Sequence, residues 1–134
     1  MEYKITEQFS KRFFIDLGLR PEYEEDASPF SVDDIKGWYT EWQKNLAEKE
    51  EPYFAGIVTA TNFVYAFSKN GAVRGMNEPA VRIEGEVSKE YHADIFDDEK
   101  KILGIIFNLA KNLGSNAKQK RVHVMFDNRF FVLE

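Results

Sequence analysis

Alternation of apolar and polar residues along the chain predicts several β-strands. Residues 11–19 carry apolar side chains at every second position, which is the period of a strand with one buried face. These side chains are Phe13, Ile15, Leu17 and Leu19. Residues 80–88 alternate apolar with charged side chains, as a sheet with one wet face requires. Residues 121–126 and 129–133 flank Asp127 and Asn128, which predicts a C-terminal hairpin.

The stretch 53–88 predicts an antiparallel meander. Residues 53–60 and 63–67 are rich in β-branched and aromatic side chains, and Thr61 and Asn62 are expected to form a tight turn between two strands. The alternative is one long strand that continues through this pair. Asn70 and Gly71 form a stronger turn signal, because both residues tolerate positive φ.

Two segments show the period of an amphipathic helix. The first begins after Ser31, which can cap the first turn, and ends before Pro52. Its apolar positions share one face: Ile35, Trp38, Tyr39, Trp42 and Leu46. The second is predicted over 98–113, with Asp98 at its start and Gly114 just past its end. This segment is apolar around more than one stripe, so we expect it to lie across the sheet in the core.

The resulting order is β-α-β-β-(β)-β-α-β-β. Grouped strands with few helical crossovers favour an α+β fold, in which a single-layer antiparallel sheet of five to six strands packs against two helices. At 134 residues, the chain has the length of one domain, so we expect residues 1–134 to form a single unit.

Charge is distributed unevenly. Residues 1–99 carry a net charge of −10 and the last 35 residues a net charge of +5, within a total of −5. The cations of the last segment either bind an anion or complement the acidic part of the same fold. An overall pI near 5.2 is opposite to the usual signature of nucleic-acid binding, so no nucleic-acid partner is expected.

Several chemistries are disfavoured by composition. The chain has no cysteine, which excludes disulfides, thiolate zinc sites and a cysteine nucleophile. No phosphate-binding glycine loop or Gly-x-Ser-x-Gly element occurs. His92 and Asp94 could contribute to a metal site, but one imidazole beside helix-capping carboxylates is weak support, so no metal or cofactor is expected. With no secretion signal and no membrane-length apolar run, the expected location is the cytoplasm.

The acidic majority of the chain, interspersed with aromatic residues, favours a protein-binding module over an enzyme. Carboxylates speed the encounter with a basic partner, and aromatic anchors supply short-range energy. We therefore predict an inhibitor-type binder of a basic protein, as immunity proteins, antitoxins and phage anti-defence proteins are; self-association as a homodimer is left open. The candidate contact residues are Tyr23, Glu24, Glu25, Trp38, Trp42 and Glu50, although the two tryptophans could instead belong to the core.

The alternative hypothesis is a domain that binds a small molecule or nucleotide through its basic C-terminal hairpin. Cationic side chains and a histidine in this segment could hold an anionic group. The candidate residues are Lys120, Arg121, His123 and Arg129.

Overall fold

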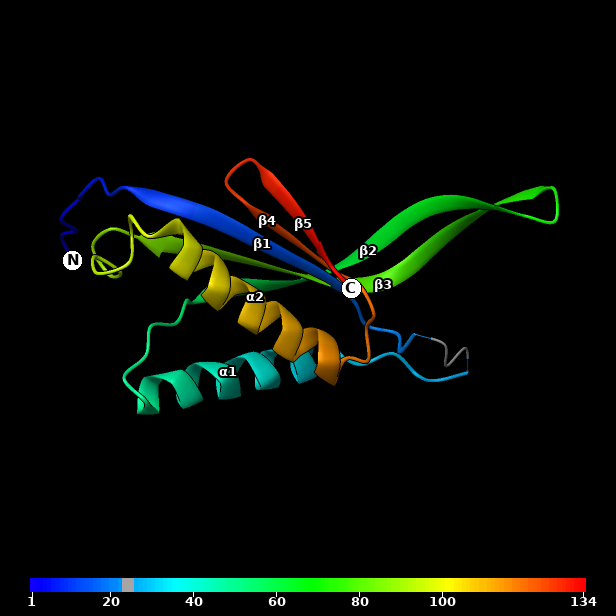
Figure 1. Cartoon of the computed structure of the whole chain (residues 1–134), viewed down its shortest axis with the longest axis horizontal. Helices are drawn as coiled ribbons and strands as arrows, with labels where there is room; N and C mark the ends of the chain where they lie inside the picture. The colour runs from blue at the N-terminus through cyan, green and yellow to red at the C-terminus, as the bar shows by residue number, and fades with distance from the viewer. Residues whose placement is uncertain (23–25) are drawn as a thin grey trace.

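Two helices lie on one face of an antiparallel sheet (Figure 1), in a computed structural model that describes residues 1–22 and 26–134. Within these ranges the elements follow the order β1 (Ser10–Gly18), α1 (Val32–Glu48), β2 (Gly56–Lys69), β3 (Ala72–Ser88), α2 (Glu99–Asn116), β4 (Val122–Phe126) and β5 (Arg129–Leu133). The five described strands are arranged as β2-β3-β1-β4-β5. The predicted α+β fold class is confirmed.

The core lies between the helices and the inner face of the sheet. The alternation in β1 turns Phe13, Ile15 and Leu17 inward, and each is fully buried. Apolar residues of α2 meet them from the other side, which confirms that this helix is central. The indole Nε1 of Trp42 donates to Asn108 Oδ1 at 2.8 Å, so a hydrogen bond joins the two helices.

Helix capping follows the sequence at the N-terminal ends. Ser31 accepts from the Asp34 amide and donates its own amide to the Asp34 carboxylate, forming a capping box. The prediction that α2 ends before Gly114 is wrong, because α2 continues to Asn116. A Cβ at Gly114 would lie 2.6 Å from Val122 Cγ2, so this glycine permits close packing of α2 against β4 and does not end the helix.

The favoured prediction of two strands separated by Thr61 and Asn62 is also wrong. β2 runs without a break through both residues, which pair with Ala80 and Pro79 of β3, and so the single-strand alternative is correct. The turn at Asn70 and Gly71 is confirmed, with φ values of 53° and 80°. The C-terminal hairpin of β4 and β5 is confirmed as well.

The β2–β3 hairpin extends well beyond the rest of the sheet. β1 ends at Gly18, opposite Ala80, so residues 62–79 continue past the last β1 pairing as a two-stranded ribbon. We call this segment the arm. Figure 1 shows it projecting away from both helices. None of the helices described is long and apolar enough to cross a membrane.

Candidate functional site

The sheet face opposite the helices carries the polar and aromatic side chains that strand alternation turns away from the core. We call it the open face; Phe63, Tyr65 and Glu78 continue it along the base of the arm. In the main sheet its side chains include Arg12, Phe14, Asp16, Ile57, Thr59, Arg82, Glu84, Glu86, His123, Met125, Phe130 and Val132. Among the described residues, neither helix covers this face (Figure 1).

A bidentate ion pair lies near the middle of the open face. Arg82 donates from Nε and Nη2 to the two carboxylate oxygens of Asp16, at 2.7 and 2.8 Å. The guanidinium carbon also lies 5.0 Å from the centre of the Phe14 ring. The hydrogen bond to Asp16 raises the pKa of Arg82, against a smaller lowering by burial. The pair therefore holds two opposite charges in fixed positions on an otherwise accessible surface.

A tyrosine–carboxylate pair lies at the base of the arm. Tyr65 Oη donates to Glu78 Oε1 at 2.9 Å. This hydrogen bond is the main cause that raises the pKa of Tyr65, with lesser contributions from burial and the negative charge of Glu78. Tyr65 thus remains a hydrogen-bond donor at neutral pH, and it orients the Glu78 carboxylate. Side chains with perturbed pKa values are enriched at functional sites, and both Tyr65 and Arg82 lie on the open face.

Aromatic rings from three strands meet beside the Tyr65–Glu78 pair. The His123 ring of β4 lies 5.8 Å from the Phe63 ring of the arm and 5.4 Å from the Phe130 ring of β5, in edge-to-face geometry. Phe63 is also the register partner of Glu78. The open face therefore places a carboxylate next to an aromatic surface, which suits a ligand that has a planar ring and a positive charge.

Of the residues predicted to contact a partner, Trp38, Trp42 and Glu50 fall within the described residues. Tyr23, Glu24 and Glu25 lie outside the described residues. Trp42 is 5% exposed and belongs to the core, as the core alternative for the tryptophans allows. Trp38 is half-buried against Phe30, with ring centres 5.2 Å apart in edge-to-face geometry.

Two further predicted residues occupy the periphery of the fold. Glu50 is exposed just past the end of α1, with φ of 58°. His92, considered above as a metal ligand, instead supports a loop: its Nδ1 accepts from the Ser88 amide at 3.0 Å, and its Nε2 lies 3.2 Å from the Tyr53 carbonyl oxygen.

The four residues of the alternative anion-binding set are dispersed. Arg129 lies at the turn end of the hairpin and pairs with Glu99 of α2 at 2.6 Å, on the helix side of the sheet. Arg121 lies at the other end, 3.7 Å from Glu134, and lines a small cavity with Lys120. His123 belongs to the open face. The set does not form one anion site.

Sequence reasoning missed the residues that define the open face. The alternation in 80–88 indicates that Arg82 is on the wet side of a strand, but its partner Asp16 is 66 positions away. Tyr65 and Glu78 face one another only because β2 is continuous, and the favoured turn at Thr61 would have altered that register.

Two solved structures resemble the chain over nearly its whole length, and both are of a phage SAM lyase. The structure in complex with S-methyl-5'-thioadenosine has a TM-score of 0.63 and 19% sequence identity, covering 99% of this chain and 94% of the other. The apo structure has a TM-score of 0.65 and 15% identity, with the same coverage. At these identities the likeness establishes a shared fold. No protein-family model and no curated protein matches the chain.

These matches correct two predictions. The prediction of an inhibitor-type binder of a basic protein is wrong, and so is the preference for a non-enzyme, because the fold that the chain shares end to end is that of an enzyme with a small-molecule ligand. One physical reason is that several acidic side chains pair with cations of the same sheet. Arg12 lies within salt-bridge distance of Glu84 and Glu86, and Arg82 pairs with Asp16.

Proposed function

We propose that this chain binds S-adenosylmethionine and cleaves it, releasing S-methyl-5'-thioadenosine, with the open face as the binding site. The observation that carries the proposal is the end-to-end match to a phage SAM lyase in complex with S-methyl-5'-thioadenosine. The chemistry of the open face supports it independently, because the substrate combines a planar adenine with a cationic sulfonium.

Each part of the substrate has a suitable counterpart. Phe63 and His123 offer ring surface on which adenine can stack, an interaction worth about 1–3 kcal/mol per base in nucleic-acid complexes. Glu78 supplies the negative charge for the cationic part of the substrate, and the Tyr65 hydroxyl holds this carboxylate in orientation. The Asp16–Arg82 pair supplies both an anion and a cation for the charged groups of the amino acid moiety.

The reaction breaks the bond between the sulfonium and the four-carbon amino acid side chain. Sulfur keeps the electron pair and becomes the neutral thioether of S-methyl-5'-thioadenosine. The four-carbon fragment completes its valence either by losing a proton or by closing on its own carboxylate.

The test is formation of S-methyl-5'-thioadenosine from S-adenosylmethionine, followed by liquid chromatography with mass detection of both fragments. Glu78→Gln is expected to lower kcat/KM by about 100-fold, because it removes the negative charge that faces the cationic part of the substrate. Tyr65→Phe should lower it by about tenfold or less, since one neutral hydrogen-bond donor is lost.

Glu41→Gln is the matched control, because Glu41 is an exposed carboxylate of α1 on the helix side, paired with Lys44. It should leave turnover unchanged. If the wild-type chain neither forms the product nor binds substrate or product in calorimetry, the proposal is wrong. If Glu78→Gln is as active as wild type, the assignment of the open face is wrong.

A further inference from the structure

Arg82 has hydrogen-bond donors that its ion pair with Asp16 does not use. A guanidinium group offers N–H donors along more than one edge. Its Nε and Nη2 donate to the Asp16 carboxylate at 2.7 and 2.8 Å. Nη1 makes no hydrogen bond to any residue within 1–22 and 26–134. The edge that carries Nη1, which we call the outer edge, is therefore available to a ligand.

The two members of this ion pair are unequally exposed. The side chain of Asp16 is 14% exposed, whereas that of Arg82 is 46% exposed. The Phe14 ring, 5.0 Å from the guanidinium carbon, supports one face of the guanidinium group. Because the carboxylate and the ring hold this group in place, binding a ligand costs little further side-chain entropy. An oriented arginine edge of this kind suits a planar carboxylate, which accepts parallel hydrogen bonds.

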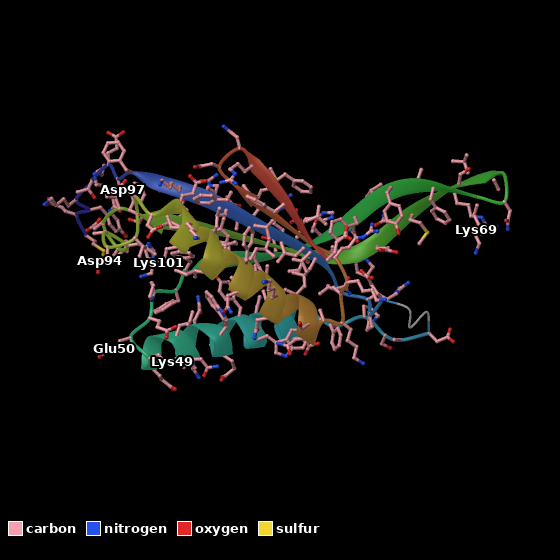
Figure 2. The ribbon with its side chains drawn as sticks, viewed as in Figure 1. Lys49, Glu50, Lys69, Asp94, Asp97 and Lys101 are labelled. Carbon is pink, nitrogen blue, oxygen red and sulfur yellow. The ribbon has the colours of Figure 1, made fainter. Side chains whose placement is uncertain are left out.

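Other cations are less suited to an anionic ligand at this site. Arg12, on the same face, already lies 3.3 and 3.2 Å from the carboxylates of two glutamates of β3. An anion bound to Arg12 would therefore meet two negative charges. Figure 2 shows Lys69 near the tip of the arm and Lys101 near the start of α2, toward the opposite end of the molecule. The outer edge of Arg82 is the cationic group that combines orientation with a place in the middle of the open face.

Arg82 also lies within reach of a ligand that stacks on the aromatic rings. It follows Glu78 by four residues on β3, so their Cα atoms are about 13 Å apart and both side chains share one face. Asp16 is the register partner of both Arg82 and His123. Two strand spacings place the Cα of Arg82 about 10 Å from that of His123. A nucleoside stacked on the His123 ring can thus extend a side chain to Arg82.

We propose that the outer edge of Arg82 binds the α-carboxylate of S-adenosylmethionine and restricts the site to sulfonium nucleosides that keep this carboxylate. The proposal rests on the proposed function and adds the class of substrate to it. Decarboxylated S-adenosylmethionine, which keeps the adenine and the sulfonium, is then a poor ligand. S-methyl-5'-thioadenosine has no carboxylate, so its affinity does not depend on Arg82.

The experiment is calorimetric binding of ligands that lack the sulfonium leaving group and are not cleaved. S-adenosylhomocysteine and its decarboxylated counterpart differ only in the carboxylate, and S-methyl-5'-thioadenosine is the third ligand. Wild type should bind S-adenosylhomocysteine about tenfold or more tightly than the decarboxylated compound, because a charge-assisted hydrogen bond is lost. The double variant Asp16→Asn with Arg82→Gln removes both charges together and should abolish this preference.

A single substitution keeps a partner for the Asp16 carboxylate. Arg82→Lys retains the positive charge but loses the planar edge, so it should lose most of the preference. Circular dichroism checks that each variant is folded, and if the double variant is unfolded, Arg82→Lys decides the outcome. Both variants should bind S-methyl-5'-thioadenosine as tightly as wild type does.

Arg129→Gln is the matched control. Arg129 also pairs with a carboxylate, that of Glu99 at 2.6 Å, and its guanidinium carbon lies 4.9 Å from the Phe131 ring centre, but on the helix side of the sheet. This variant should keep the wild-type preference for the carboxylate.

Two kinds of failure can be told apart. If wild type binds the nucleosides but does not distinguish the two that differ in the carboxylate, the role of Arg82 is wrong and the proposed function stands. The role is also wrong if folded Arg82 variants keep the preference, or if they weaken S-methyl-5'-thioadenosine to the same extent. If wild type binds none of the three ligands and does not cleave S-adenosylmethionine, the proposed function is wrong and this inference fails with it.

Discussion

Replacing Tyr39 by phenylalanine tests how the core anchors the segment that leads into β2. Tyr39 is 4% exposed, and its hydroxyl donates to the Phe54 carbonyl oxygen at 2.7 Å. The same oxygen accepts from Gln43 Nε2 at 3.2 Å. Both bonds tie α1 to the chain just before Gly56, where β2 begins.

The Phe54 carbonyl oxygen accepts two hydrogen bonds, and this sets how much stability Tyr39→Phe should cost. A typical intramolecular hydrogen bond contributes about 0.5–1.5 kcal/mol net, and an orphaned buried carbonyl costs about 1–3 kcal/mol. Tyr39→Phe leaves the carbonyl bonded to Gln43, so we expect a loss of about 1 kcal/mol in the free energy of unfolding. Adding Gln43→Met should orphan the oxygen and cost more than the sum of the single changes.

The same residue predicts a pH dependence. Burial raises the pKa of Tyr39 above its usual value of 10.0 in the folded chain. As pH rises through 10.0, the Tyr39 hydroxyl loses its proton in the unfolded chain but keeps it in the folded chain, so the unfolded state becomes more favourable. The stability is therefore intact below about pH 10 and should fall above it by about 1.4 kcal/mol per pH unit, until the folded pKa is reached.

Urea unfolding of wild type, Tyr39→Phe and Gln43→Met over the alkaline range measures this slope. Tyr39→Phe should be less stable at neutral pH and should lose stability less steeply at alkaline pH. Gln43→Met should be less stable but keep the wild-type slope, because it removes a hydrogen bond and no titrating group. If wild type and Tyr39→Phe have the same alkaline slope, Tyr39 is not buried as described.

Further predictions concern backbone positions, each measured by chemical denaturation. Gly85→Ala should lower the free energy of unfolding by about 1–3 kcal/mol, because the added Cβ would overlap the Phe13 ring. Adding Phe13→Leu to this variant should recover part of the loss. If the two substitutions lower the free energy of unfolding additively, this packing is contradicted. Glu50→Gly should raise the free energy of unfolding by about 1 kcal/mol, because Glu50 has φ of 58°, which glycine adopts without strain. Glu48→Gly inside α1 should lower it. If both variants are less stable than wild type, the backbone argument is refuted.

The elements that the sequence predicted well are those set by local chemistry. Phe13, Ile15 and Leu17 alternate, so their strand and its buried face follow from period alone. Ser31 with Asp34, and Asn70 with Gly71, carry their own capping or turn geometry. The continuity of β2 at Thr61 could not be predicted in this way, because it depends on a partner strand that is long enough to pair with it.

The candidate site depends on contacts that no local pattern encodes. His123 meets Phe63 across the sheet, and Asp16 meets Arg82 through the pairing of β1 with β3. The sequence did single out His123, but as part of a basic cluster with Arg129. The fold places Arg129 on the other side of the sheet. The charge counts led to the wrong prediction of a basic partner for the same reason, because strand register decides which charges face each other.

The most direct test of the central claim is a crystal structure of this chain with S-methyl-5'-thioadenosine. The account predicts the adenine against Phe63 and His123, with the sulfur on the side of Glu78. S-methyl-5'-thioadenosine bound away from Phe63, His123 and Glu78 would contradict it.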